Sequence, residues 1–387
     1  MKVAVVGGGP AGLFFARLLK RRQPRHEIVV FEQNPQDATY GFGVTLAGPA
    51  RDRLRRADAE IHDGLAACMV FNDEQAIDLN GKRVQLKYAH KGGAIARLTL
   101  LNLLEQLCRA IDIPVLHERR IQTADDLEDF DLVVGADGAN SVVRSIQPDA
   151  FGVNTRVLNT RFAWYGVNKA LKPNALVFKN IDGGVFVGHY YAYAPDMSTF
   201  VAECEGETWE KCGLATMSDA MRKSLMERLF ARELEGMPLI ENKSVWRQFT
   251  ATTTDRWSYR NSVLIGDALR VAHYSIGSGT RLAMDDAFAL YEALVKCDDD
   301  VPSALAKFVE LRKPNRDLFT AATVRSFEWY ENVAAEMGAD VVDFTRSFLT
   351  RTGRVDEKRL RDYVPDFYRD YIAPRELAKA AGREARA

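Results

Sequence analysis

Residues 3–12 read VAVVGGGPAG, an apolar run that leads directly into a glycine-rich turn. The run is short and rich in valine, which predicts a buried parallel strand. The next segment, LFFARLLKRR at 13–22, has helical spacing and the basic end that a helix C-terminus favours. A GxGxxG pattern between a strand and a helix predicts a dinucleotide-binding site. The alternative is a glycine-rich turn in an unrelated α/β domain.

Each glycine of this pattern has a physical reason. Gly7 permits a tight turn, Gly9 lets the backbone approach a pyrophosphate, and Gly12 lets the helix pack against the strand. Glu32 lies near the end of a second predicted strand, EIVVFEQ, twenty residues after Gly12. A carboxylate there accepts hydrogen bonds from a ribose diol and repels a 2′-phosphate, which favours FAD or NAD over NADP. The predicted contacts of this motif are Gly7, Gly9, Ala11, Gly12, Glu32 and Gln33.

Two later segments also end an apolar strand on a carboxylate. FDLVVGADGANSVVRS at 130–145 stops at Asp137, and SVLIGDALR at 262–270 stops at Asp267. The carboxyl ends of strands are where open α/β sheets bind ligands. Taken singly, each segment also fits a plain turn in which the aspartate caps a helix.

Together the three segments resemble the FAD-dependent aromatic hydroxylases with the para-hydroxybenzoate hydroxylase fold, over residues 1 to about 300. The resemblance implies that Asp137 lies near the pyrophosphate and the NAD(P)H path and that Asp267 binds the ribityl chain of FAD. It also implies that Arg97 contacts FAD and that GFGVTLAG at 41–48 lies beside the flavin. FAD is therefore the expected cofactor, with NADH or NADPH as co-substrate.

A narrower branch of this family is also similar. HYSIGSGTRLAMDDA at 273–287 resembles the corresponding segment of the salicylyl-CoA 5-hydroxylase, 2-aminobenzoyl-CoA monooxygenase and violacein-pathway indole hydroxylase branch. The segment departs from the general family pattern, because no histidine follows Gly266-Asp267-Ala268 and no proline is present in the loop. The backbone N–H groups at Gly279 and Thr280 begin a predicted helix, which suits the partial negative charge of a reduced flavin.

The same resemblance implies the chemistry. NAD(P)H reduces FAD, O2 adds to give a C4a-hydroperoxide, and an electron-rich ring attacks its distal oxygen. Imidazole can accept a proton near neutral pH, so His273 is predicted to orient or deprotonate the substrate. The alternative is a structural histidine bonded within the loop, and His189 is the reserve candidate.

The middle of the chain, residues 153–254, is expected to form a substrate domain. Residues 175–204 alternate as antiparallel strands do and are rich in aromatic residues. Aromatic side chains suit a planar ligand, although they fill sheet cores more often. The aromatic and histidine candidates for an inward face are Trp164, Phe186, His189, Tyr191 and Phe200, and Tyr274 joins Trp164, His189 and Tyr191 as a predicted substrate contact.

The expected fold is α/β, with an FAD-binding domain interleaved with a mostly antiparallel, α+β substrate domain. Residues 1–75, 90–152 and 255–300 are assigned to the first, residues 76–89 and 153–254 to the second, and residues 301–387 to a C-terminal helical region. A net charge of −1 gives no electrostatic basis for binding nucleic acid or an anionic membrane. The scattered cysteines suggest reduced thiols in a cytoplasmic protein, and no spacing suggests a metal site.

The leading functional prediction is a monooxygenase that uses O2 to hydroxylate a small aromatic substrate. The preferred substrate class is an aryl-CoA thioester of the salicylyl or 2-aminobenzoyl type. A free aromatic or indole-derived intermediate remains open, as does a flavin reductase of the same fold that never oxygenates. The chain is expected to be a monomer or a homodimer.

Overall fold

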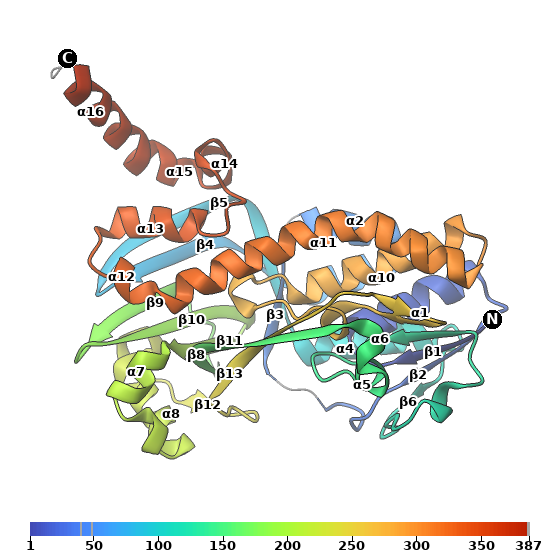
Figure 1. Ribbon diagram of the computed structural model, residues 1–387. Coiled ribbons are helices and arrows are strands. Elements are labelled where there is room, and N and C mark those ends of the chain that lie inside the picture. Colours follow the sequence, from blue (N-terminus) through green and yellow to red (C-terminus); the bar gives the residue numbers. More distant parts are fainter. Residues whose placement is uncertain (39–40, 48, 385–387) are drawn as a thin grey trace.

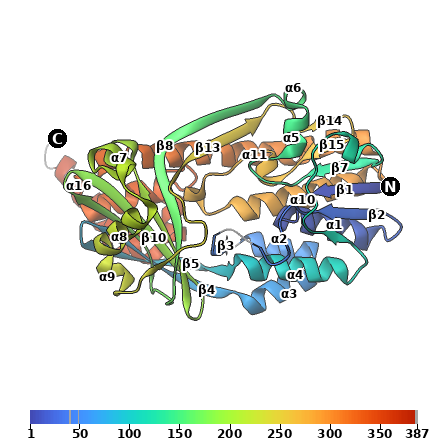
Figure 2. The ribbon, with the colours of Figure 1, turned by 90° about the horizontal axis from the view of Figure 1, so that it is seen from below.

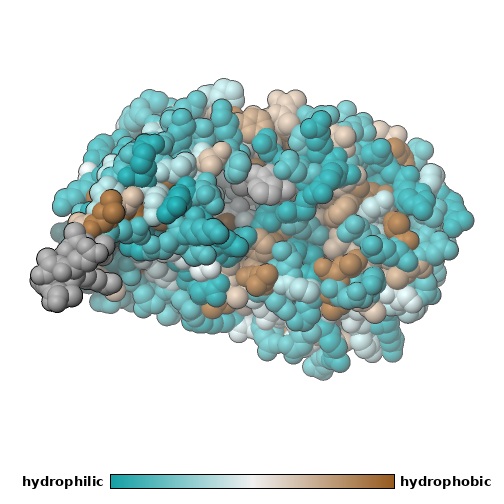
Figure 3. Space-filling view, turned by 90° about the horizontal axis from the view of Figure 1, so that it is seen from above, coloured by the Kyte–Doolittle hydropathy of each residue, from teal (hydrophilic) through white to brown (hydrophobic). Residues whose placement is uncertain are grey.

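The computed structural model describes residues 1–38, 41–47 and 49–384. Gly48, the last residue of the predicted flavin loop, lies outside them. Mixed sheets and helices make up the chain, so the predicted α/β class is confirmed. None of the described helices is long and apolar enough to cross a membrane. Seen from above, teal hydrophilic residues cover most of the surface and brown hydrophobic ones lie in separate groups (Figure 3).

The first sheet contains the strands of all three motifs. Its order is β14–β15–β7–β1–β2–β6, parallel throughout except for the edge strand β14. Their bounds are β1 Lys2–Val6, β2 Glu27–Phe31, β6 Val115–Leu116, β7 Leu132–Gly135, β14 Ser258–Tyr259 and β15 Ser262–Leu264. Because β1, β7 and β15 are adjacent and parallel, the turns after Val6, Gly135 and Leu264 meet at one edge.

Helices cover this sheet and fix the direction of the motifs. α1 (Pro10–Arg22) begins directly after the glycine turn, with Pro10 at a position where a missing N–H does no harm. α10 (Gly279–Lys296) packs beside α1, and the long α11 (Val301–Glu331) packs on α10 (Figure 1). The remaining helices of this part are α2 Pro49–Ala57, α3 Ala59–Cys68, α4 Arg97–Arg109, α5 Val142–Ile146 and α6 Pro148–Phe151.

The second sheet has the order β12–β8–β11–β10–β9–β4–β5–β3, with β13 paired to β8. Its strands are β3 Gly43–Ala47, β4 Val70–Leu79, β5 Lys82–Ala96, β8 Val153–Val167, β9 Asn174–Ile181, β10 Gly184–Ala194, β11 Met197–Cys204, β12 Leu239–Ile240 and β13 Arg247–Thr254. The N-terminal contribution is longer than the predicted 76–89, because the hairpin β4–β5 starts at Val70 and β3 joins its edge. The long strands β8 and β13 run side by side and connect the two parts of the molecule (Figure 2).

Helices also cover both faces of the second sheet. Phe186, Tyr190 and Phe200 pack toward α7 Gly206–Lys211, α8 Asp219–Leu229 and α9 Ala231–Leu234. Val185 and Val187, the alternate residues of β10, pack toward Tyr330 and Phe344 of the C-terminal region. That region contains α11, α12 Val333–Glu336, α13 Val341–Thr350, α14 Glu357–Tyr363, α15 Pro365–Phe367 and α16 Ala373–Glu384, and α16 projects away from the body (Figure 1).

Candidate active site

A cleft of about 380 Å³ lies where the carboxyl ends of β1, β2, β7 and β15 meet the second sheet. The structure brings together residues that are far apart in the sequence. The predicted cofactor residues that line the cleft are Gly7, Gly9, Ala11, Glu32, Gln33, Arg97, Asp137, Asp267, Gly279 and Thr280. Gly12 lies behind the cleft, where a Cβ atom would stand 2.1 Å from the Gly7 carbonyl oxygen, so it serves close packing.

The glycines of this cleft leave room for a ligand. Gly7 has φ +110° and lies so close to Ala136 that a Cβ atom would stand 2.4 Å from its carbonyl oxygen. Gly9 differs, because a Cβ atom there would meet only the Ala136 oxygen at 3.9 Å. A Cβ atom on Gly279 would meet no described atom within 4 Å. These two glycines therefore border space that the protein itself does not fill, as a dinucleotide cradle requires.

Acidic side chains supply hydrogen-bond acceptors to the cleft. Glu32 Oε2 accepts the N–H of Gly8 at 2.8 Å, and its Oε1 accepts the N–H of Asn34 at 2.8 Å. Asp137 Oδ2 accepts the N–H groups of Val142 and Val143 at 2.6 and 3.3 Å. The Asp137 side chain therefore caps α5, as the structural alternative expected. Its other oxygen, Oδ1, is buried with no hydrogen-bond partner among the described residues, which leaves an acceptor for a ligand.

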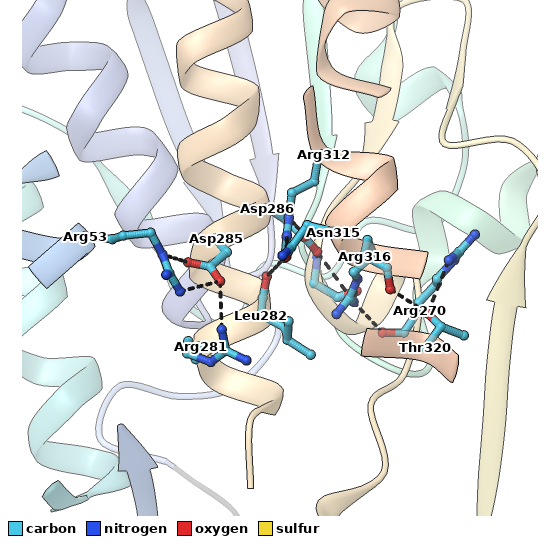
Figure 4. Close-up of polar contacts among 11 residues, drawn as sticks. Arg53, Arg270, Arg281, Leu282, Asp285, Asp286, Arg312, Asn315, Arg316 and Thr320 are labelled. Atoms are coloured by element: carbon cyan, nitrogen blue, oxygen red, sulfur yellow. Dashed lines mark hydrogen bonds and ion pairs between the residues drawn. The ribbon is translucent and has the colours of Figure 1, made fainter. Parts of the chain in front are cut away.

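A buried ion-pair network holds the Gly266-Asp267 turn from behind, and Figure 4 shows its members Asp286, Arg312 and Arg316. Asp286 Oδ2 accepts the N–H of Gly266 at 3.0 Å, and Oδ1 accepts Arg312 Nε at 2.6 Å. Arg316 Nη2 donates to the carbonyl oxygens of Gly266 and Arg270 at 3.2 and 2.8 Å. Sequence reasoning missed this support, because Arg312 and Arg316 lie on α11, outside all three motifs.

Asp267 and Arg97 influence each other across the cleft. Burial raises the pKa of Asp267, and the guanidinium groups of Arg316 and Arg97 oppose that rise. Burial likewise lowers the pKa of Arg97, against the attraction of Asp267 and Tyr191. A positive and a negative group thus face the same space, as a ligand with both phosphates and hydroxyl groups would need.

His273 does not reach the cleft. Its side chain is fully buried and lines neither this cleft nor the cavity described below. Nδ1 lies 2.8 Å from Ser275 Oγ and accepts the N–H of Ser275 at 3.3 Å, so the ring caps a 3-10 turn over Tyr274–Ile276. Burial lowers the pKa of His273 to about 3, which keeps the ring neutral. This placement does not support the predicted contact with substrate and favours the structural alternative.

The loop that follows separates the cleft from a second cavity of about 570 Å³. Tyr274 and Gly277 line both spaces. Of the other predicted substrate contacts, His189 lines the second cavity, whereas Trp164 and Tyr191 line the first cleft. The expected inward position of Phe186 and Phe200 was wrong, because both side chains are buried on the opposite face of the sheet, in the core beside α7–α9.

The C-terminal helices form the far wall of the second cavity, which sequence reasoning also missed. Phe319 and Tyr330 come from α11, and Phe348 and Arg351 come from the end of α13. Glu203 of β11 lies among them. The only sequence signal for Glu203 was a carboxylate within the apolar strand MSTFVAEC, at even spacing from Val201.

Comparison with known proteins agrees with this geometry. A family model described as an FAD binding domain matches residues 117–314, and an NAD(P)-binding Rossmann-like domain matches residues 5–38. The salicyloyl-CoA 5-hydroxylase of a Streptomyces species is 37% identical over 368 residues, covering 91% of this chain and 70% of that protein. The chain belongs to the FAD-dependent aromatic monooxygenases. The matches support FAD as the cofactor of this monooxygenase, with NAD(P)H as reductant.

Two further relatives of the monooxygenase act on different substrates by name. The 3-hydroxy-4-methyl-anthranilyl-[aryl-carrier protein] 5-monooxygenase of Streptosporangium sibiricum is 37% identical, covering 81% of this chain and 84% of that protein. Protodeoxyviolaceinate monooxygenase of Chromobacterium violaceum is 31% identical, covering 91% and 94%. The solved structure of 2-methyl-3-hydroxypyridine-5-carboxylic acid oxygenase shares the fold, with TM-score 0.73 at 18% identity over 91% of this chain and 96% of that one.

Proposed function

We propose that this monooxygenase hydroxylates an electron-rich aromatic ring that is carried as a thioester on coenzyme A or a carrier protein. The observation that carries the proposal is the second cavity, which shares Tyr274 and Gly277 with the cofactor cleft. A ring in that cavity borders the place where a flavin in the cleft would end. The names of two relatives, a salicyloyl-CoA hydroxylase and an anthranilyl-carrier-protein monooxygenase, support the thioester.

The mouth of the second cavity is basic. Arg354 and Arg359 line the cavity and are exposed, and Arg359 Nη1 donates to the Arg354 carbonyl oxygen at 2.7 Å. The Arg354 guanidinium lies 3.9 Å from the centre of the Phe319 ring, which fixes its position. Both coenzyme A and a carrier-protein arm present phosphate groups, and arginine binds phosphate well. We therefore place the aromatic ring of the substrate inside the second cavity and the phosphate groups of its carrier at this mouth.

The bound FAD, once reduced by NAD(P)H, would supply the oxygen-activating chemistry. Gly7 and Gly9 would hold its phosphates, Asp137 would lie near them and Glu32 would bind its ribose, while Arg97 and Asp267 would contact the rest of the molecule. Trp164 and Tyr191 would border the ring system, and Tyr274 with Gly277 would lie where it meets the substrate. His273 would hold the loop through Ser275 and would not touch the substrate.

A substrate panel tests the proposal. The FAD-loaded protein is supplied with NADH or NADPH and with salicylyl-CoA, 2-aminobenzoyl-CoA, their free acids, or indole. We expect a thioester to accelerate NAD(P)H oxidation and to yield a product heavier by one oxygen atom. NAD(P)H oxidation without a hydroxylated product from any probe would instead indicate a reductase.

The basic mouth can be tested separately. We expect the double change Arg354→Glu and Arg359→Glu to lower kcat/KM for the coenzyme A ester at least tenfold, because it replaces phosphate-binding groups with repelling ones. The N-acetylcysteamine thioester, which lacks phosphates, should be affected far less. Arg228→Glu, an exposed change that borders neither cavity, is the control. An equal loss with both thioesters would contradict the phosphate assignment.

A free aromatic or indole-derived substrate is the second candidate. The similarity to protodeoxyviolaceinate monooxygenase favours this second candidate, because the match extends over 94% of the length of that relative. In that case the free compounds of the panel would be hydroxylated, and the arginine changes would have little effect.

A further inference from the structure

Glu203 is a buried carboxylate that none of the motifs explains. It lies on β11, where the strand alternation directs Val201 and Glu203 toward the second cavity and Phe200 and Ala202 toward the opposite core. Only 4% of its surface is exposed. Its Oε1 atom is buried and has no hydrogen-bond partner among the described residues. A polar acceptor thus lies in the wall of the cavity without a protein group to satisfy it.

The groups around Glu203 leave it without a strong cation partner. The Tyr274 hydroxyl, on the loop between the two cavities, is close enough to interact with the carboxyl, yet it too lacks a hydrogen-bond partner of good geometry among the described residues. The guanidinium of Arg351 directs its hydrogen bonds to Phe348, Ser275 and Ser326 and not to the Glu203 carboxyl. The charged or titratable groups that share the cavity with Glu203 are Tyr88, His90, His189, Tyr274, Tyr330, Arg351, Arg354, Arg359, Asp362 and Tyr363.

Burying a carboxyl group without a partner is unfavourable, because the charged form loses its hydration. Burial raises the pKa of Glu203 to about 8, while Tyr274 and Arg351 work against the rise. The carboxyl therefore changes protonation within the range in which enzymes operate. Buried groups of this kind, directed into a cavity, occur often where a proton is moved.

We propose that Glu203 accepts the hydrogen bond, and then the proton, of the O–H or N–H group on the aromatic ring of the substrate. The inference rests on the proposed function, since it assigns a residue to the same cavity. The proton passes from the ring heteroatom to Oε1 of the carboxylate as the ring attacks oxygen, so the carboxyl becomes neutral. The electron pair of the broken O–H or N–H bond stays on the heteroatom and enriches the ring for attack on oxygen. The proton returns to the heteroatom when the product forms.

Other groups of the cavity serve this role less well. Burial, with Arg351 adding to it, lowers the pKa of His189 to about 4, so it would be a weak base. Burial raises the pKa of Tyr274 and Tyr330, so both hydroxyls stay protonated and neither can take up the substrate proton. His273, the sequence candidate, is shielded from both spaces. Glu203 is the buried group here that combines an unsatisfied acceptor with a suitable proton affinity.

The central experiment compares the wild type with Glu203→Gln, which keeps the shape of the side chain and cannot take up a proton. We expect hydroxylation of salicylyl-CoA to fall by about 10²- to 10⁴-fold, as the loss of a general base does. FAD binding and the rate of flavin reduction by NAD(P)H should stay within twofold, and peroxide should replace the product. Glu203→Asp should recover part of the rate. Glu207→Gln, an exposed change on α7, is the matched control.

The pH profile gives a second readout. Product formation by the wild type should rise with pH through about 8, the pKa of the carboxyl, because the charged form is the acceptor. This rise should be absent from Glu203→Gln. Without any substrate, infrared spectra of the FAD-loaded wild type should contain the carbonyl band of a buried, protonated carboxyl that disappears as pH rises through about 8. The variant should lack this band.

A substrate change separates a direct contact from a general disturbance. The 2-methoxybenzoyl-CoA probe has no proton on the ring oxygen. Relative to salicylyl-CoA, it should lower the hydroxylation rate of the wild type by a factor at least ten times larger than the factor for Glu203→Gln. An unchanged rate and pH profile in the variant, with an active wild type, would overturn the role of Glu203 alone. A wild type that hydroxylates no probe would overturn the proposed function, and the assignment of Glu203 with it.

Discussion

The guanidinium of Arg351 donates a hydrogen bond from Nη2 to the backbone oxygen of Ser275, at 2.8 Å. A residue at the end of α13 thereby holds the loop that divides the cofactor cleft from the second cavity. Nε of the same side chain donates to Ser326 Oγ at 3.1 Å, and that hydroxyl lies 2.8 Å from Ser275 Oγ. His273 completes the network through Ser275 Oγ. The position of the dividing loop therefore depends on α11 and α13 together.

Replacing Arg351 with lysine should loosen this loop. A single ammonium group cannot reach Ser275, Ser326 and Phe348 at once, and each buried acceptor left without a donor costs about 1–3 kcal/mol. We expect urea unfolding to show a loss of that order and the fraction of NAD(P)H that yields product to drop, with FAD still bound. Arg325→Lys, an exposed arginine that donates to Thr352, is the control and should leave both values nearly unchanged.

Substitutions at two glycines of the first motif should affect different properties of the protein, FAD affinity for one and stability for the other. Gly9→Val places its side chain in the open part of the cleft, at an ordinary φ of −77°, so the stability of the apoprotein should change by less than about 0.5 kcal/mol. Its affinity for FAD, measured by the fluorescence of the free flavin, should fall at least tenfold. Gly12→Ala should instead lower the stability of the apoprotein by about 1–3 kcal/mol, because the new methyl group meets the Gly7 oxygen. Equal FAD affinity of the wild type and Gly9→Val would contradict the cradle.

Asp286→Asn should destabilise the protein strongly. The change removes the negative charge that faces the buried guanidinium groups of Arg312 and Arg316, and an unpaired buried charge costs about 3–5 kcal/mol. We expect a lower Tm and faster release of FAD, because the Gly266-Asp267 turn loses its support. Asp285→Asn, next in sequence, breaks only partly exposed pairs with Arg53 and Arg281, so about 1 kcal/mol is expected.

Acid should weaken the fold through His273. Its pKa is about 3 in the folded protein and about 6.5 in the unfolded chain, so the unfolded state binds the extra proton between these values. The free energy of unfolding should therefore fall as pH drops below about 6.5, by up to about 1.4 kcal/mol per pH unit from this group. Asn can still accept the Ser275 N–H, so His273→Asn should remove this part of the slope between pH 7 and 5. Parallel slopes for the two proteins would show that the ring stays accessible to protons.

Glu203 should give the free energy of unfolding the opposite dependence on pH. Its folded pKa of about 8 lies above that of a free glutamate, so the native state keeps a proton that the unfolded chain has lost. Stability should fall as pH rises from about 4.5 to 8. Glu203→Gln should be the more stable protein at pH 8, with a smaller advantage at pH 5, as equilibrium unfolding would measure.

The cofactor cleft could be predicted from sequence because its signals are local. A glycine turn after β1, Asp137 after β7 and Asp267 after β15 each follow a recognisable strand, and parallel strands bring such turns together. The second cavity could not be predicted in this way. Its walls combine β4, β10 and β11 with Phe319, Tyr330 and Arg351, which lie more than a hundred residues later in the chain.

The directions in which side chains point could not be predicted from local sequence signals either. From the loop sequence, His273 is expected next to the cavity. Its ring instead points into the protein, where it contacts Ser275, and Ser275 in turn contacts Ser326 of α11. The loop sequence alone does not contain the position of Ser326. For the strands, alternation alone separates Phe186 from His189, since residues three apart face opposite sides. The sequence pattern contains this information, but the aromatic content of the segment conceals it.

The dinucleotide cleft comes from residues that end at Ala283, whereas the outer wall of the second cavity comes from residues 319–363. The two are therefore separate along the chain, apart from contacts such as that of Arg351 with Ser275. A chimera that takes α13 and α14 from a homologue and keeps Arg351 should change the choice of ring while retaining its own redox machinery. The proposed choice of ring would then be determined largely by the final quarter of the polypeptide.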